Sequence, residues 1–206
     1  MKRIGILGGT FNPVHFAHLF MALTAYESAG LDKVVFMPSK NQNYKSTNEL
    51  ASNEDRLKML KLAVREFPFF EVSDFEMMLE GEYSFTYMTL DAYKKQYPDC
   101  ELYFIIGADS LMKFDTWRHP ELIIKECRLL AFYRSGISEE EADSKLKELE
   151  KKYSISISLI EMPYIGITST MIRQRAFEGK ELGLYLPSDE AEYIREKGLY
   201  RRKNGT

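Results

Sequence analysis

Short apolar runs alternate with longer amphipathic stretches along most of this chain. Ile4–Leu7 is an apolar run that stops at a Gly-Gly pair, and Val34–Met37 is a second run that ends at Pro38. Between them, residues 14–29 are helix-forming and largely apolar, and Gly30 is the expected end of that helix. Strand, glycine loop, helix and strand in this order predict a βαβ unit with a right-handed crossover.

The same alternation continues toward the end of the chain. Serines alternate with Ile155, Ile157 and Leu159, which is typical of a half-exposed strand near a sheet edge. Ser84 is the expected N-cap of one of the later helices. Further strands are expected at 69–72, 102–106, 128–133 and 155–159, and helices at 52–67, 84–97, 120–125, 138–152, 168–179 and 188–197. This order predicts an α/β fold, with an open parallel sheet of about five to seven strands and helices on both faces.

Length and composition fit one globular domain. The chain has 206 residues, of which 45% are hydrophobic and 29% charged, and it contains no repeat or linker. We therefore expect a single domain over residues 1–206, with the helices from about residue 169 packed on it. The basic tail at 201–206 is expected to be frayed.

Charge and cysteine usage exclude several classes of protein. Lys and Arg total 28 and Asp and Glu total 31, so the net charge of −3 argues against a general nucleic-acid binder. Cys100 and Cys127 lack the spacing of a disulfide framework or a zinc site, which predicts reduced thiols in a cytoplasmic protein.

Residues 4–26 form an uncharged segment that is long enough to cross a membrane. The segment also contains a Gly-Gly pair, Asn12, Pro13 and two histidines, which argue against a membrane span and against a signal peptide. An uncharged but polar and glycine-rich segment is typical of a buried active site.

Glycines and hydroxyl residues follow several of the expected strands. These segments are 8–13, 39–40, 107–109 and 166–170. In an open parallel sheet, ligands bind outside the carboxyl ends of the strands. The composition of these segments indicates a ligand that carries phosphate.

His15 and His18 lie three residues apart at the start of an expected helix, so they share a face. Free backbone N–H groups and the helix dipole favour an anion there, and two imidazoles can donate hydrogen bonds to phosphate oxygens. A zinc site is the alternative for this pair, but no carboxylate accompanies it locally.

Three hydroxyl residues open the helix that begins near residue 168. Arg173 follows them within the first turn or two with no acid before it, so a bound anion would reverse an unfavourable interaction with the helix dipole. We therefore expect Arg173 to bind phosphate and Arg175 to be solvated. Asp109 follows the most hydrophobic strand, where it could accept from ribose hydroxyls or cap a helix, and the two roles do not exclude each other. Trp117 alone is more typical of a core edge than of a ligand-stacking residue.

The segments GGTFNPVHFAH at 8–18 and ITSTMIR at 167–173 resemble the signatures of a nucleotidyltransferase superfamily. With EDRL at 54–57, VSDFE at 72–76, SFT at 84–86, IGADSL at 106–111, Trp117-Arg118 and Leu199-Tyr200, the resemblance is to the bacterial nicotinate-nucleotide adenylyltransferases, over nearly the whole chain. The resemblance implies a Rossmann-like fold.

It also implies transfer of the adenylyl group of ATP to nicotinate mononucleotide, giving deamido-NAD and pyrophosphate in NAD biosynthesis. The attack is expected to be direct and in line, without a covalent enzyme intermediate, and Mg²⁺ is expected on the ATP phosphates. ATP and nicotinate mononucleotide are thus the expected partners, with no nucleic acid and no membrane. The sequence leaves open whether the protein is a homo-oligomer.

The resemblance assigns roles to individual residues. The catalytic residues implied are Thr10, His15, His18 and Arg173. The ATP-binding residues implied are Gly8, Gly9, Thr10, Phe11, His15, His18, Gly107, Asp109, Ile167, Ser169, Thr170 and Arg173, of which Ser169, Thr170 and Arg173 would hold the departing pyrophosphate. The substrate-binding residues implied are Asn12, Lys45, Thr86 and Trp117.

The chain departs from the family pattern at two places. Ala17 replaces the glycine between the signature histidines, and the segment after the second strand lacks the usual Pro-His-Lys element, so either Lys40 or Lys45 would reach the phosphates. Three alternatives stay open. They are a sister transferase for nicotinamide mononucleotide, phosphopantetheine or a phosphorylated alcohol, a nucleotide sensor without turnover, and a zinc hydrolase.

Overall fold

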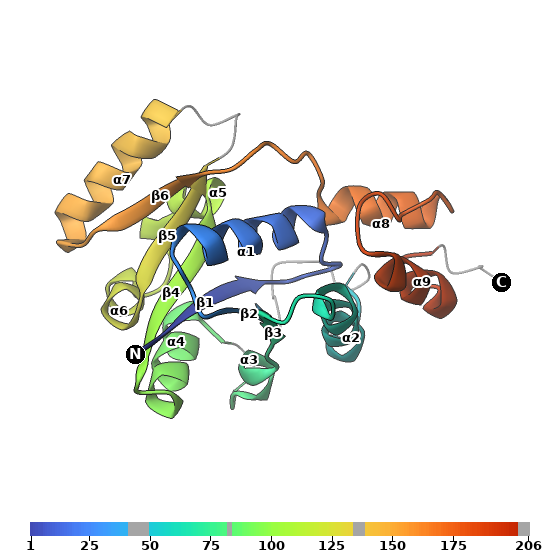
Figure 1. Ribbon diagram of the computed structural model, residues 1–206, viewed down its shortest axis with the longest axis horizontal. Helices are drawn as coiled ribbons and strands as arrows, with labels where there is room; N and C mark the ends of the chain where they lie inside the picture. The colour runs from blue at the N-terminus through green and yellow to red at the C-terminus, as the bar shows by residue number, and fades with distance from the viewer. Residues whose placement is uncertain (41–49, 82–83, 134–138, 202–206) are drawn as a thin grey trace.

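The computed structural model of the protein describes residues 1–40, 50–81, 84–133 and 139–201. Across these residues, one sheet of six parallel strands has the order β3-β2-β1-β4-β5-β6 (Figure 1). The strands are β1 (Lys2–Gly9), β2 (Lys33–Pro38), β3 (Phe70–Val72), β4 (Cys100–Gly107), β5 (Arg128–Tyr133) and β6 (Ile157–Glu161). The expected α/β fold and its open parallel sheet are confirmed.

Helices cover both faces of the sheet, as expected (Figure 1). Those packed on one face are α1 (Phe16–Ser28) and α2 (Asn53–Val64), and those on the other are α4 (Thr86–Gln96), α6 (Pro120–Glu126) and α7 (Glu139–Tyr153). Three short helical segments were not predicted from the sequence: α3 (Phe75–Met78), α5 (Ala108–Met112) and the 3₁₀ helix η2 (Phe114–Thr116). Finally, α8 (Ser169–Phe177) and α9 (Ser188–Lys197) pack with α2 in a third apolar cluster, which we call the C-terminal lobe.

The middle residues of the inner strands are apolar because both faces of the sheet are buried there. In β4, Phe104 packs on the α4 side of the sheet, whereas its neighbour Ile105 packs on the α1 side. This alternation follows from the two-residue period of a strand. In the edge strand β6, Ile157 is buried and Ser158 is exposed, which confirms the half-exposed pattern seen in the sequence.

The strand order creates a switch point at β1. The chain proceeds from β1 outward to β2 and β3, and then crosses to β4 on the other side of β1. Ligand-binding crevices of open α/β sheets lie at such points, outside the carboxyl ends of the strands. The carboxyl ends of β1 and β4 therefore mark the place for a site.

Two local expectations need correction. Ser84 does not cap α4, because the helix begins at Thr86 and the Ser84 hydroxyl donates a hydrogen bond of 2.7 Å to Glu76. The helix expected to reach residue 67 ends at Val64. The Phe67 N–H donates to the Val64 carbonyl and so forms a turn after the helix. Of the basic tail, Arg201 is described and 202–206 lie outside the described residues.

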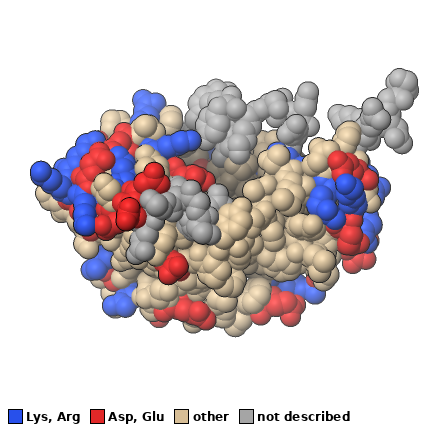
Figure 2. All heavy atoms as spheres, turned by 90° about the horizontal axis from the view of Figure 1, so that it is seen from above, with Lys and Arg blue, Asp and Glu red and all other residues tan. Residues whose placement is uncertain are grey.

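The uncharged N-terminal segment is not buried throughout. Phe16 and Phe20 of α1 are each 38% exposed. Figure 2 shows the face of the molecule that is seen from above in Figure 1. Charged side chains gather at its two ends, over α7 and over the C-terminal lobe, while its middle is largely uncharged. In the described part of the chain, no helix is long and apolar enough to cross a membrane.

The buried strands predict where truncation destabilises the fold. Phe36 of β2 is 0% exposed, so Phe36→Ala should lower the free energy of unfolding by about 3–5 kcal/mol, through lost burial and the cavity left behind. Phe177→Ala is the matched control, because Phe177 is 47% exposed and its truncation should cost under about 1 kcal/mol. Urea unfolding of both variants measures the difference, and equal losses would contradict this account of the core.

Candidate active site

The loop after β1 crosses the carboxyl end of the sheet. Gly9 accepts a hydrogen bond from the Ser39 N–H at 2.9 Å, which fastens the loop to the end of β2. A Cβ at Gly9 would lie 3.0 Å from the Phe11 ring, so the residue at this position must be small. Phe11 itself is 2% exposed and packs on Phe36, so it anchors the loop in the core instead of facing a ligand.

The structure brings the two signature histidines together at the start of α1. His15 is the N-cap residue, and its ring stacks on that of His18 with 3.8 Å between the centroids. Burial lowers the pKa of His15 to about 2, with a further contribution from His18, and burial lowers the pKa of His18 to about 4. Both imidazoles are therefore neutral near pH 7. Their Nδ1 atoms are buried and have no hydrogen-bond partner among the described residues.

The start of α8 is tied to the β1 loop although 156 positions separate the two segments. The Ser169 hydroxyl donates to the Pro13 carbonyl at 2.8 Å, and Arg173 Nη1 donates to the Asn12 carbonyl at 2.9 Å. Arg173 Nη2 also donates to the Thr170 hydroxyl at 3.3 Å. The two signatures recognised in the sequence are thus adjacent in space. Thr168 is the N-cap among the three hydroxyl residues and accepts from the Met171 N–H.

Arg175 was expected to be solvated, but the structure shows it partly exposed and bonded within the C-terminal lobe. Its guanidinium donates to the Glu181 carbonyl and lies 4.4 Å from the centre of the Tyr185 ring. Arg173 and Arg175 therefore lie on one helix with different surroundings.

Arg56 was not assigned a role from the sequence, yet it organises the site. It is 1% exposed and donates to the carbonyls of Thr10 at 2.7 Å, Ser39 at 2.7 Å and Lys40 at 3.1 Å. These bonds hold the ends of β1 and β2 against α2, and burial lowers the pKa of Arg56. The EDRL segment was a motif of the resemblance, but its spacing does not show that the arginine points into the protein.

A cavity of about 230 Å³ lies beside the histidines, on the α1 side of the sheet. The residues that line it include His15, Ala17, His18, Gly107, Asp109, Ile167 and Ser169. The structure thus collects six of the twelve residues expected for ATP at this cavity, while Gly8 and Gly9 line the cavity on the other face. Asp109 is not the N-cap of α5, because Gly107 holds that position. Its role as an acceptor for ribose hydroxyls stays a prediction.

A larger cavity of about 690 Å³ lies on the other side, toward α4. Its lining includes Gly8, Gly9, Ser39, Glu76, Ser84, Phe85, Thr86, Trp117 and Arg118. Thr86 and Trp117, far apart in sequence, are brought to one wall. The half-buried Trp117 ring also packs edge-on against Phe104, so it serves the core edge and the cavity together.

Glu76 is a further residue that sequence reasoning did not assign. Its carboxyl lines the larger cavity, and burial raises its pKa, while hydrogen bonds from Ser84 and other groups oppose that rise. Arg118 lies 4.7 Å from the centre of the Phe85 ring on the same wall. The larger cavity therefore presents both an acid and a guanidinium.

Several expected residues lie outside these two cavities. The Thr10 carbonyl is held by Arg56, and the Asn12 side chain accepts from the Ala51 N–H and the Tyr200 hydroxyl. Lys40 Nζ donates to the carbonyls of Leu79 and Gly81, which fastens the wall next to α3. Lys45 lies outside the described residues. Thr170 and Arg173 lie beside the smaller cavity, at the start of α8.

The donor set bears on metal binding. In the described ranges, no group of three or more His, Cys, Asp or Glu side chains lies close enough to hold a metal ion. Of the described residues that line the smaller cavity, Asp109 carries the single carboxylate. An ion that takes most of its ligands from phosphate and water fits such a site, as Mg²⁺ does.

Comparisons with known proteins agree with this geometry. Residues 6–175 match the model of the family described as cytidylyltransferase-like. A protein of Lachnoclostridium phytofermentans named "Probable nicotinate-nucleotide adenylyltransferase" is 40% identical over 97% of this chain and 100% of its own length. A protein of the same name from Desulfitobacterium hafniense is 40% identical over 97% of this chain and 96% of its own length.

Solved structures show the same fold. A Plasmodium falciparum nicotinic acid mononucleotide adenylyltransferase complexed with NaAD superposes with a TM-score of 0.79 at 21% identity, covering 97% of this chain and 98% of the other. The same enzyme complexed with APC gives 0.77 at 19% identity over the same shares. Family model, relatives and site geometry together show that this chain belongs to the nicotinate-nucleotide adenylyltransferases, within the cytidylyltransferase-like family.

Proposed function

We propose that this protein joins ATP and nicotinate mononucleotide across the β1 loop, forming deamido-NAD and releasing pyrophosphate. The observation that carries the proposal is the pair of cavities on opposite faces of the sheet, separated by the carboxyl ends of β1 and β4. Two substrates seated in them would meet at the loop that holds the histidines. The structural neighbour complexed with NaAD supports a dinucleotide product.

The smaller cavity takes the adenosine of ATP in this proposal. Gly107 and Ile167 line it, and Asp109 offers a carboxylate to the ribose hydroxyls. At its inner end, the start of α8 presents Ser169, Thr170 and Arg173, which are donors suited to the departing pyrophosphate. Thr10 belongs to the same phosphate region through the loop that Arg56 fixes.

The larger cavity takes the nicotinate mononucleotide. Its Trp117 ring offers a face for stacking on the pyridine ring, and Thr86 lies at the start of α4, where N–H groups can meet a carboxylate. Arg118 adds a positive charge to this wall. These features favour nicotinate over nicotinamide, because the acid carries a charge that the amide lacks. Asn12 and Lys45, also expected to bind this substrate, remain predictions.

The transfer needs no covalent intermediate. A phosphate oxygen of the mononucleotide attacks the α-phosphorus of ATP, and the bond from that phosphorus to the pyrophosphate oxygen breaks. His15 and His18, neutral in the ligand-free protein, would donate N–H groups to the oxygens on which charge develops. Positioning and charge stabilisation then supply the catalysis.

Mg²⁺ would arrive with ATP and neutralise charge on its phosphates. Asp109 is the described side chain on the smaller cavity that could add one carboxylate ligand, while the histidines and Arg173 bind phosphate oxygens directly. The small-molecule substrates are the proposed partners, without nucleic acid or membrane. The free thiols of Cys100 and Cys127 support a cytoplasmic location.

The acceptor is tested by pyrophosphate release from ATP and Mg²⁺. We expect fast release with nicotinate mononucleotide and release slower by about tenfold or more with nicotinamide mononucleotide, because Thr86 and Arg118 recognise the charged acid. His18→Ala should abolish most of the release with either acceptor. Equal rates with the acid and the amide would contradict the assignment of the larger cavity, and release with neither would remove the proposed function.

The two arginines of α8 provide a matched pair. Arg173→Ala should lower kcat/KM for ATP by about 10²-fold, because one charged donor to the pyrophosphate is lost. Arg175→Ala removes the same side chain two positions away, where its bonds go to the Glu181 carbonyl, and should change kcat/KM less than about threefold. Steady-state kinetics measure kcat/KM for ATP in both variants. Similar losses of kcat/KM in the two would show that α8 contributes only its general positive charge.

The neutral histidines make folding stability depend on pH. The unfolded chain has histidines with a pKa near 6.5, whereas His15 in the folded protein has a pKa of about 2. Below about pH 6.5, His15 binds a proton in the unfolded state but not in the folded state. The free energy of unfolding therefore falls as the pH decreases. His15→Gln should reduce the loss between pH 7.5 and 5.0 by about 2 kcal/mol. Urea unfolding at both pH values measures it, and an unchanged loss would mean that folded His15 takes up the proton.

A further inference from the structure

The C-terminal residues of the described chain return to the β1 loop. After α9, Gly198 adopts a left-handed conformation with φ of 63°, and the Leu199 N–H bonds back to the Ile194 carbonyl at 3.0 Å. The turn leads to Tyr200, whose hydroxyl donates a 2.7 Å hydrogen bond to Oδ1 of Asn12, 188 positions earlier in the chain.

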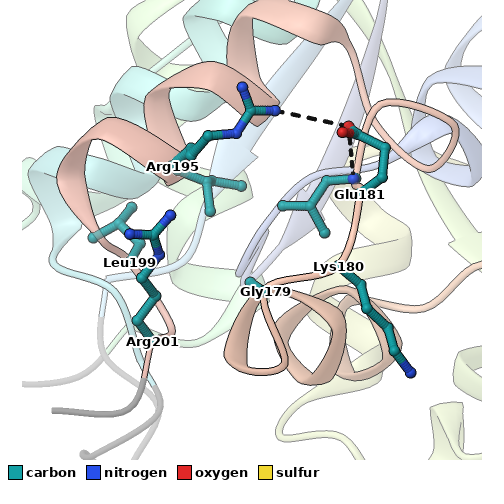
Figure 3. Close-up of a pocket in the computed structure, with 9 residues that line it drawn as sticks. Gly179, Lys180, Glu181, Arg195, Leu199 and Arg201 are labelled. Carbon is teal, nitrogen blue, oxygen red and sulfur yellow. Dashed lines mark hydrogen bonds and ion pairs between the residues drawn. The ribbon is translucent and has the colours of Figure 1, made fainter. Parts of the chain in front are cut away.

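The turn is anchored in the C-terminal lobe on both sides of Tyr200. Figure 3 shows the pocket between α8 and α9, which Leu199 and Arg201 line, while Arg195 reaches toward Glu181 across the same pocket. Leu199 also packs against the apolar cluster of the lobe. The backbone at Tyr200 is therefore held by its neighbours, and its hydroxyl is presented to the β1 loop.

Asn12 links this hydroxyl to the phosphate region. Its Oδ1 atom accepts from Tyr200 and, at 3.0 Å, from the Ala51 N–H, which fixes the amide plane of the side chain. Its main-chain carbonyl accepts from Arg173 at 2.9 Å. The side chain and the main-chain carbonyl belong to the same residue. The Tyr200 hydroxyl, which fixes the Asn12 side chain, therefore also affects the direction of the Asn12 carbonyl.

Charged groups surround the Tyr200 hydroxyl. Burial is the largest cause that raises the pKa of Tyr200 well above its usual value. Glu190 raises this pKa further, whereas Arg173 and Arg56 lower it. Glu190 is 0% exposed, and neither of its carboxyl oxygens has a hydrogen-bond partner among the described residues. Burial raises the pKa of Glu190 well above its usual value. Tyr200 therefore keeps its proton near pH 7, and its hydroxyl donates to Oδ1 of Asn12.

We propose that Tyr200 is a positioning residue, which holds Asn12 so that the Asn12 carbonyl keeps Arg173 aimed at the ATP phosphates. Tyr200 touches neither cavity and acts through Asn12. The inference rests on the proposed role of Arg173 in binding ATP. It adds the C-terminal turn to the parts of the molecule that determine ATP affinity.

The test compares Tyr200→Phe with Tyr193→Phe. Tyr193 lies on α9 of the same lobe, and its hydroxyl donates to Asp55 of α2 at 2.8 Å instead of to the β1 loop. Each variant removes one tyrosine hydroxyl hydrogen bond, so both should lower Tm by a similar amount. We expect Tyr200→Phe to weaken ATP binding about tenfold by calorimetry without acceptor, and Tyr193→Phe to stay within twofold of the wild type.

A double-mutant cycle then separates positioning from general stability. If Tyr200 acts through Arg173, Tyr200→Phe combined with Arg173→Ala should bind ATP no more than about twofold more weakly than Arg173→Ala alone. Additive losses, or ATP binding by Tyr200→Phe within twofold of the wild type, would overturn the proposal. Failure of the nicotinate assignment would leave these ATP affinities unchanged, and a wild-type protein that does not bind ATP would contradict both proposals.

Discussion

The site depends on two guanidinium groups that hold main-chain carbonyls, the buried one of Arg56 and the half-buried one of Arg173. Arg56 donates hydrogen bonds to the carbonyls at the ends of β1 and β2, and Arg173 donates to the Asn12 carbonyl. A loop that crosses the end of a sheet leaves carbonyls without strand partners, and burial of such groups is costly unless they are paired. The arginines satisfy them, and they also bring positive charge to the place where phosphate would lie. Fold stability and ligand binding therefore share the same contacts here.

The fold was largely readable from the sequence because its inner strands are buried on both faces. Continuous apolar runs between amphipathic stretches identify such strands without knowledge of their partners. The local details were less accessible. Ser84 has the right type and place for an N-cap, but a buried carboxyl at Glu76 competes for its hydroxyl, and Glu76 comes close only through tertiary packing.

The candidate site was readable where a motif is contiguous. His15 and His18 are neighbours because one helical turn separates them, and their stacking follows from that spacing. Arg56 shows the opposite case, since a charged residue on an amphipathic helix normally faces solvent. Its burial results from carbonyls that belong to other segments. Likewise, no local pattern connects Asn12 to Tyr200, whose hydroxyl donates to the Asn12 side chain.

The switch point at β1 also separates the two cavities. Lining residues of the smaller cavity come from α1, the end of β4 and the start of α8, whereas those of the larger one include the start of α4 and the segment after η2. No described residue lines both cavities, so in the proposed function the ATP side and the acceptor side have separate walls. An ancestral enzyme with this arrangement could therefore have exchanged one acceptor for another by remodelling a single wall, and the machinery that activates ATP would have been inherited intact.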